Sequence, residues 1–311
     1  MRQAIIVQGG APKARGPAHA LRLGYGLFKL RIGLVIGLTA VAGAAVAPGP
    51  GLGGWQLFLL ALAVTGAAAA AGGFNQFVER DLDRLMQRTR HRPFVTGELA
   101  ADHRFLWLLG VVLVVSVALT AWVANALAAA YVFLGAFFYG VVYTVWLKRR
   151  TWWNIVIGGA AGSFAVLAGA AAVTPGAPAA VPAILAAVLF LWTPPHFWSL
   201  AIVCRDDYAR VGVPMLPVVV GDRRCARVIL AHTVALTALS IVPLAYGMGW
   251  IYGAGAIAGG ALFVLTSVRL VRHPSRQGRG PTFSLRWCSS DCCSFPRSPS
   301  ARSAPEPVSW R

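Results

Sequence analysis

Oxygen-bearing side chains recur at helical spacing just after one long apolar stretch. Asn75, Glu79 and Asp83 are each four residues apart, so they share one face if a helix continues through them. Two carboxylates and an amide form a negative site that suits Mg²⁺ held jointly with substrate phosphates. Arg88 and Arg92 follow, and their guanidinium groups match phosphate oxygens. A solvated charged loop with helical ion pairs is the alternative interpretation.

A second acidic cluster, Asp206 and Asp207, also stands where an apolar stretch ends. His196 lies about three helical turns before it, inside the apolar run. An ionisable side chain at that depth is a functional candidate by default. A histidine that bonds to a neighbouring helix, or lies beside the Pro194-Pro195 kink, is the alternative.

The two acidic clusters, each next to basic residues, are the arrangement that a diphosphate bridged by Mg²⁺ requires. Carboxylates would hold the metal ions, and cations would hold the remaining phosphate oxygens. The other end of such a substrate would lie between apolar helices. The pattern therefore indicates an isoprenyl diphosphate as the substrate.

The composition determines which elements must position these residues. The chain has 311 residues, of which 57% are hydrophobic and 12% are charged, and its mean hydropathy is +0.65. Soluble domains carry about 25% charged residues, so the composition excludes a disordered protein and nearly excludes a soluble enzyme. The apolar stretches are close to the roughly 20 residues that cross a bilayer as a helix, and they predict eight spans, at residues 32–50, 55–76, 105–123, 127–147, 153–173, 179–203, 228–247 and 250–270. We expect an all-α polytopic membrane helix bundle.

Charge is confined to alternate links between the predicted spans. All 28 lysines and arginines and all 10 acidic residues lie before residue 32, in 77–104, in 148–150, in 204–227 or from 269 onwards. The intervening links carry no charge. By the positive-inside rule, both the N-terminus and the site face the cytoplasm, across the inner (plasma) membrane of a bacterium. The net charge of +18 is therefore mainly a topology signal, and we predict no nucleic-acid partner.

The two ends of the chain differ from the apolar centre. Residues 1–27 are basic, free of acidic residues and rich in glycine and proline, and we expect a loose cytoplasmic tail. Residues 28–272 form the predicted membrane domain. From 273 the sequence becomes atypical, and residues 281–311, rich in Ser, Pro, Arg and Cys, resemble out-of-frame translation. We expect this tail to be disordered.

Six segments in order resemble the UbiA superfamily of membrane prenyltransferases, over roughly residues 24–272. They are residues 29–32, 75–93, 147–159, 192–198, 206–208 and 212–217. The His-Phe-Trp run at 196–198 and the Pro-Met-Leu-Pro run at 214–217 resemble the haem-farnesylating branch. The quinone-directed branch usually has Asp where His196 stands. Glu79 departs from the usual Asp of the family, and Leu30 departs from its usual Pro.

The resemblance implies a nine-helix fold and transfer of a farnesyl group from farnesyl diphosphate to a vinyl group of haem B. It implies that Mg²⁺ is the cofactor and that haem B is a substrate. The implied roles are as follows: Asn75, Glu79, Asp83, Asp206 and Asp207 serve the metal ions; Arg88, Arg92 and Lys148 hold the diphosphate; His196 contacts the haem.

Two other functions remain open from the sequence alone. Another aromatic prenyltransferase, acting on a quinone or chlorophyll precursor, would use the same diphosphate site. A membrane transporter would also fit eight helices interrupted by Gly and Pro, although uncharged links on one face favour chemistry at the other. The resemblance also makes contacts with haem A synthase or terminal oxidase assembly factors an expectation.

Overall fold

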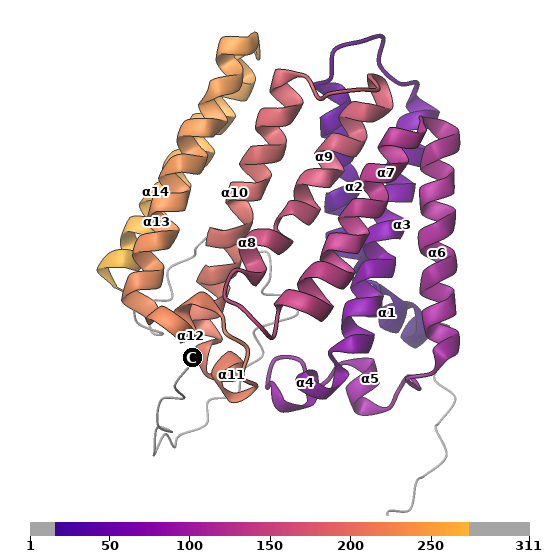
Figure 1. Ribbon diagram of the computed structural model, residues 1–311, viewed down its shortest axis with the longest axis vertical. Coiled ribbons are helices and arrows are strands. Elements are labelled where there is room, and N and C mark those ends of the chain that lie inside the picture. Colours follow the sequence, from indigo (N-terminus) through magenta and orange to yellow (C-terminus); the bar gives the residue numbers. More distant parts are fainter. Residues whose placement is uncertain (1–15, 274–311) are drawn as a thin grey trace, which may run out of the picture.

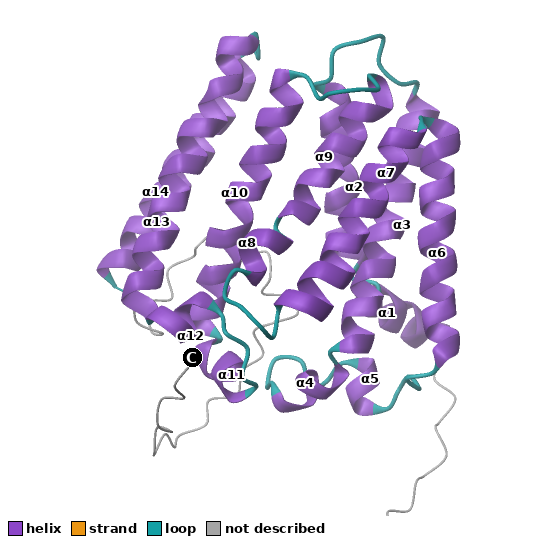
Figure 2. Cartoon of the chain, viewed as in Figure 1, coloured by secondary structure: helices purple, strands orange, loops and turns teal. Residues whose placement is uncertain are grey.

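The computed structural model describes residues 16–273, which form helices and loops without a strand (Figures 1 and 2). Seven helices are long and apolar enough to cross a membrane, and the bent pair α1–α2 makes an eighth candidate. The chain is therefore an integral membrane protein with the predicted all-α polytopic architecture. The spans, some made of two helices, are α1 (Pro17–Leu27) with α2 (Leu30–Ala45), α3 (Gly54–Val78), α6 (His103–Val123), α7 (Ala126–Phe137) with η1 (Phe138–Leu147), α8 (Asn154–Gly158) with α9 (Ala160–Val173), α10 (Ala180–Val203), α13 (Asp222–Ile241) with η2 (Val242–Tyr246), and α14 (Trp250–Arg272).

Short helices gather at one end of the bundle, at the bottom of Figure 1. They are α4 (Arg80–Leu85), α5 (Pro93–Thr96), α11 (Arg205–Arg210) and α12 (Leu216–Val220). We call this the charged end, because both acidic clusters lie there. Helix α13 begins at Asp222, six residues before the predicted span at 228, because its first two turns are polar and extend past the apolar run.

One correction concerns the segment expected to be a loose tail. Residues 17–27 of that segment form α1, which meets α2 at an angle of 57°. Pro17 lies at the first helical position, where its missing N–H costs nothing. At the other end, the side-chain nitrogen of Gln76 donates to the carbonyls of Gly26 at 3.0 Å and Leu27 at 2.8 Å. These bonds satisfy carbonyls that a helix end otherwise leaves unpaired. The predicted disorder of residues 281–311 lies outside the described residues.

Small residues let α2 and α9 approach closely, which is how membrane helices gain packing. Gly43 on α2 lies against the backbone of Val166, and Gly169 on α9 lies against the backbone of Ala40. A Cβ atom on Gly169 would collide with the Ala40 carbonyl and would lie 2.8 Å from the Ala44 nitrogen. This contact therefore holds α2, and with it the start of the charged end, in place.

Gly169→Ala is expected to destabilise the protein by roughly 1–3 kcal/mol, because the backbone of α2 must move to admit one methyl group. Gly162→Ala on the same helix is the matched control, since nothing lies within 4 Å of its added Cβ. The midpoint of thermal unfolding in detergent measures the difference. Equal midpoints for the two variants would contradict the close approach of the two helices.

A hydrophobic core joins the two acidic segments at the charged end. It contains Met86 beyond α4, Tyr143 on η1, Trp198 on α10, Tyr208 on α11 and Met215 before α12, all buried. Burying these side chains fixes α4 and α11 relative to each other, although more than 120 residues separate them in the sequence. An apolar core that both segments share therefore holds the two acidic clusters at the same end of the bundle.

Candidate active site

The first acidic cluster is divided between two helices but keeps its register. Helix α3 ends at Val78, Glu79 has φ −89° and ψ 1°, and α4 begins at Arg80. Hydrogen bonds with helical spacing nevertheless cross the break, from Glu79 N to Asn75 O at 3.0 Å and from Asp83 N to Glu79 O at 2.8 Å. Asn75, Glu79 and Asp83 are 3%, 4% and 2% exposed. The structure thus brings the three predicted oxygen donors together in a buried position, with a bend that the sequence did not predict.

Each of these donors is held by a cation from a different part of the chain. Lys148 forms an ion pair with Glu79. Arg92 approaches the Asp83 carboxylate at 2.6 Å, and the Lys29 ammonium donates to the Asn75 side-chain oxygen at 2.9 Å. Burial raises the pKa of Glu79, but the charges of Lys148, Lys29 and Arg92 together, with the hydrogen bond from Lys148, hold that pKa below its usual value. Glu79 is therefore ionised, and its charge is balanced by Lys148.

Lys29 is a site residue that the sequence reasoning did not assign. It has φ 47° and is the one non-glycine residue with positive φ among residues 16–273. Left-handed backbone is unfavourable for a side-chain-bearing residue, and such strain gathers at functional sites. The available signal was the basic Lys29-Leu30-Arg31 run immediately before the first span.

A π-helical segment, η1, ends immediately before Lys148 and positions it at the site. The Lys148 amide donates to the Tyr143 carbonyl at 2.9 Å, five residues back, where an α-helix would pair residues four apart. One hydroxyl group of η1 contacts the first cluster, since Thr144 accepts from the Asn75 amide at 3.2 Å. A second contacts the cation beside that cluster, since Tyr139 accepts from Lys29 at 3.1 Å. The hydroxyl groups at Tyr139, Tyr143 and Thr144, inside an apolar span, were the signal that the sequence reasoning overlooked.

The second cluster lies on α11, and its two aspartates differ in environment. Asp206 is exposed, whereas the side chain of Asp207 is only 12% exposed and pairs with Arg210 at 3.0 Å. Arg210 also donates to the Leu85 carbonyl at 3.3 Å, which ties α11 to the end of α4. Of the two predicted donors, Asp207 is the one that lies against the rest of the site.

The predicted phosphate-binding cations fall on one side of the site. Lys148 and Arg92 already contact the carboxylates, and Arg88 lies partly buried in the turn that follows α4. If a diphosphate bound here together with metal ions, its phosphate oxygens would pair with these lysine and arginine side chains. Their positions fit charge-assisted binding of phosphate oxygens.

The donor set fits Mg²⁺ bound together with a diphosphate rather than alone. Within residues 16–273, no group of three or more His, Cys, Asp or Glu side chains converges in the way a pre-formed metal cage requires. Mg²⁺ commonly uses one or two carboxylates and takes its remaining oxygens from phosphates and water. Glu79 and Asp83 on one side, and Asp207 on the other, are the residues that would hold it.

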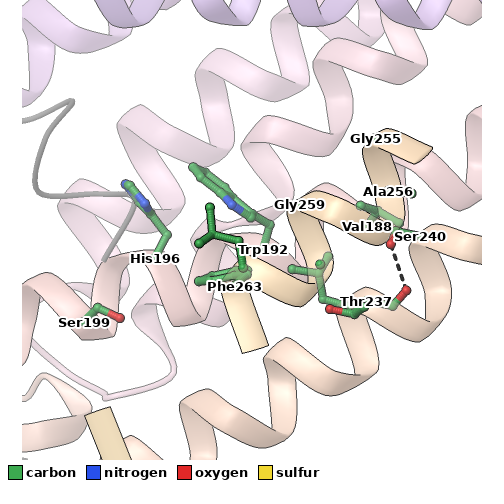
Figure 3. A pocket seen from close by; sticks show the side chains of 13 residues that line it. Val188, Trp192, His196, Ser199, Thr237, Ser240, Gly255, Ala256, Gly259 and Phe263 are labelled. Atoms are coloured by element: carbon green, nitrogen blue, oxygen red, sulfur yellow. Dashed lines mark hydrogen bonds between the residues drawn. The ribbon is translucent and has the colours of Figure 1, made fainter. Parts of the chain in front are cut away.

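His196 lies apart from these donors, in the wall of a cavity between α10, α13 and α14 (Figure 3). Its ring stacks on Trp192, with ring centroids 4.3 Å apart and planes 19° apart, and meets Phe197 edge-on. His196 lies seven residues before Val203, the last residue of α10, which is about 10 Å along the helix axis. None of the predicted metal-binding carboxylates is among the residues that line this cavity.

The fold of this chain is similar to that of solved structures. A UbiA homologue from Archaeoglobus fulgidus, solved with GPP and Mg²⁺ bound, has a TM-score of 0.70 and 19% sequence identity, with 86% of this chain and 95% of that chain covered. A digeranylgeranylglyceryl phosphate synthase structure has a TM-score of 0.67 and 17% identity, covering 83% and 90%. At this level of identity the likeness shows a shared fold.

Sequence relatives are much closer. Protoheme IX farnesyltransferase 2 of Paramagnetospirillum magneticum is 55% identical over 253 residues, which covers 81% of this chain and 87% of that protein. Protoheme IX farnesyltransferase 1 of the same organism is 50% identical, covering 83% and 90%. The profile of the UbiA prenyltransferase family matches residues 36–289, beyond the predicted domain boundary at 272. The chain belongs to the UbiA prenyltransferase family.

Proposed function

We propose that this protein transfers a farnesyl group from farnesyl diphosphate to a vinyl group of haem B, which gives haem O. The observation that carries the proposal is the pair of acidic segments, each with its own cations, held together at one end of an apolar bundle. The relatives at 55% and 50% identity, both named as protoheme IX farnesyltransferases, support the choice of haem as the acceptor.

The reaction breaks the bond between the farnesyl C1 atom and the diphosphate oxygen and forms a bond from C1 to the vinyl carbon. Water then adds to the neighbouring carbon and releases a proton, so that diphosphate and haem O leave. Mg²⁺, when bound, supplies positive charge to the departing diphosphate. Lys148 and Arg92 supply more of that charge, in a buried site where it is poorly screened. Glu79, Asp83 and Asp207 position the metal-bound diphosphate.

The orientation in the membrane is part of the proposal. The charged end would face the cytoplasm of a bacterial cell, across the inner membrane, because lysine and arginine accumulate in cytoplasmic links. The diphosphate group of farnesyl diphosphate is charged and water-soluble, so it would reach the site from the cytoplasm. Haem B and the farnesyl chain would occupy the apolar part of the bundle. Haem A synthase and terminal oxidase assembly factors are the proposed protein partners.

The haem composition of membranes that express this chain tests the proposal directly. Membranes are incubated with farnesyl diphosphate, Mg²⁺ and haem B, and the products are separated and weighed by mass spectrometry. We expect a product heavier than haem B by one farnesyl group and one hydroxyl group, and none when Mg²⁺ is chelated. Parallel incubations with an aromatic acid acceptor test the second prenyltransferase class, and prenylation of that acceptor alone would overturn the choice of haem.

A further inference from the structure

Five arginines gather where α13 begins and α14 ends. The two helices lie side by side, and the start of α13 follows α12 at the charged end (Figure 1). We call these residues the arginine edge: Arg223, Arg224, Arg227, Arg269 and Arg272. Arg272 is partly buried, and the other four are exposed. The edge is therefore a strongly basic surface outside the carboxylate site.

The register of the two helices places these arginines at a similar depth. Helices α13 and α14 are antiparallel, and the hydroxyl groups of Thr233 and Ser267 meet at 3.1 Å. At a rise of 1.5 Å per residue, Arg227 lies about 9 Å along α13 from this contact, and Arg272 lies about 7.5 Å along α14 in the same direction. The arginine edge therefore runs across both helices at one level of the bundle.

The arginine edge differs from the active-site cations in its partners. Arg92, Lys148 and Arg210 each pair with a carboxylate. Within residues 16–273, no side chain of the edge takes part in an ion pair or a hydrogen bond. The sequence has one acidic residue between positions 208 and 273, Asp222, and its carboxylate lies 3.6 Å from Arg205. Five arginines thus stand beside one carboxylate that already has a partner.

The helix dipoles account for only part of this charge. Arg269 and Arg272 lie in the last turn of α14, where a cation is favourable. Arg223, Arg224 and Arg227 lie in the first two turns of α13, where the amide groups already make the helix end positive. The positive-inside rule requires basic residues in this link, but it does not require them at this helix terminus. The start of α13 is therefore suited to an anionic ligand.

The apolar faces of the same helices identify the kind of anion. On α14, Leu265 is 58% exposed, and Arg269 lies one turn further along the same face. On α13, Val234 is 50% exposed, and Arg227 lies two turns nearer the charged end on the same face. Exposed apolar side chains of a membrane-spanning helix contact lipid tails, so the arginines stand where the tails end and the headgroups begin.

We propose that the arginine edge binds the phosphate groups of anionic lipids in the leaflet at the charged end. Guanidinium groups match phosphate oxygens in shape and charge, and the free amides at the start of α13 add to the attraction. A lipid bound there contacts both helices and holds α14 against α13, which is its main packing partner within residues 16–273. This interaction is additional to the prenyl transfer reaction and does not depend on it.

Native mass spectrometry of the full-length protein in detergent tests this interaction, with phosphatidylglycerol and phosphatidylcholine of the same acyl chains as the probes. We expect tighter binding of phosphatidylglycerol, because the choline group of the other lipid offsets its phosphate charge. The glutamine variant, Arg223→Gln/Arg224→Gln/Arg227→Gln, should raise the Kd for phosphatidylglycerol about tenfold or more. Higher salt should weaken the wild-type binding.

Two further sets of variants serve as controls. Arg90→Gln/Arg149→Gln/Arg150→Gln removes the same charge from exposed positions at the same end and should keep the wild-type Kd. Lysine at the three α13 positions keeps the charge and should retain most of the binding. The midpoint of thermal unfolding without added lipid shows whether each variant is folded. Arg227→Gln alone, with an expected loss of about fivefold, tests the same point if the glutamine variant does not fold.

Three outcomes would overturn the proposal. The first is equal wild-type affinity for the two lipids, and the second is an equal loss of affinity in the glutamine variant and in the control variant. The third is displacement of phosphatidylglycerol by inorganic phosphate at equal concentration, which would assign the arginine edge to a free anion. None of these measurements uses prenyl transfer, so they are interpreted separately from the product assay for haem O.

Discussion

Asp83→Asn should lower the rate of prenyl transfer by about 100-fold or more while leaving the protein in the membrane. The asparagine keeps the shape of the side chain but removes the charge that would hold the metal-bound diphosphate, and such charge stabilisation is worth several kcal/mol, at about 1.4 kcal/mol for each factor of ten. Asp83 is 2% exposed and pairs with Arg92 at 2.6 Å. Product formation under saturating farnesyl diphosphate, across a series of Mg²⁺ concentrations, measures the loss.

The same helix offers the control for this prediction. Asp81 lies two residues away on α4 and is exposed, so Asp81→Asn should retain close to wild-type activity. On the opposite side of the site, Asp207→Asn should lose activity to a similar extent as Asp83→Asn. The exposed Asp206 should matter less. If Asp81→Asn lost as much activity as Asp83→Asn, the result would point to a general charge effect and against a metal site at Asp83.

Lys148→Met is expected to reduce both stability and diphosphate affinity. Glu79 is 4% exposed and pairs with Lys148, and removing one partner of a buried ion pair costs about 3–5 kcal/mol because the other charge is left uncompensated. The pKa of Glu79, which Lys148 now holds down against the effect of burial, should then rise. Thermal unfolding and equilibrium binding of farnesyl thiodiphosphate measure the two losses separately.

A double-mutant cycle identifies the source of the instability. Adding Glu79→Gln to Lys148→Met should recover stability, because the uncompensated charge is gone, but should not recover diphosphate binding. Arg149→Met is the control, since Arg149 is the exposed neighbour of Lys148. A double variant no more stable than Lys148→Met would show that the unpaired Glu79 charge is not the source of the instability.

The fold class was predictable from the sequence because each membrane span is a continuous apolar segment of the chain. A helix that crosses a bilayer must be apolar along its whole length, so the spans appear as uninterrupted runs and their ends coincide with charge. The eight predicted stretches correspond to the seven long helices and the bent α1–α2 pair. The boundary at 228 differed from the observed start of α13 at Asp222 because helical hydrogen bonding can continue outside the membrane. Local hydropathy did not predict α1, because the carbonyls at its C-terminal end are satisfied by the side chain of Gln76, which is distant in the sequence.

The positions of the site residues were only partly predictable. The four-residue spacing of Asn75, Glu79 and Asp83 sufficed to predict a shared face, and helical hydrogen bonds preserve that face across the break. The pairing of Glu79 with Lys148 joins residues 69 apart in the chain, and no local pattern encodes it. It also depends on the π-helical geometry of η1, which shifts Lys148 by one residue relative to an α-helix.

By itself, the sequence determined that the protein crosses the membrane repeatedly, that its charge and carboxylates belong to one end, and that this end suits a diphosphate. These properties follow from composition and spacing within single segments. Tertiary structure alone decided that Lys29 and η1 meet the first acidic cluster, that Asp207 is partly buried while Asp206 is exposed, and that His196 lines a cavity between α10, α13 and α14. The physical reason is that these facts depend on which helices pack together, and packing is set by contacts such as Gly169 against Ala40 between distant parts of the chain.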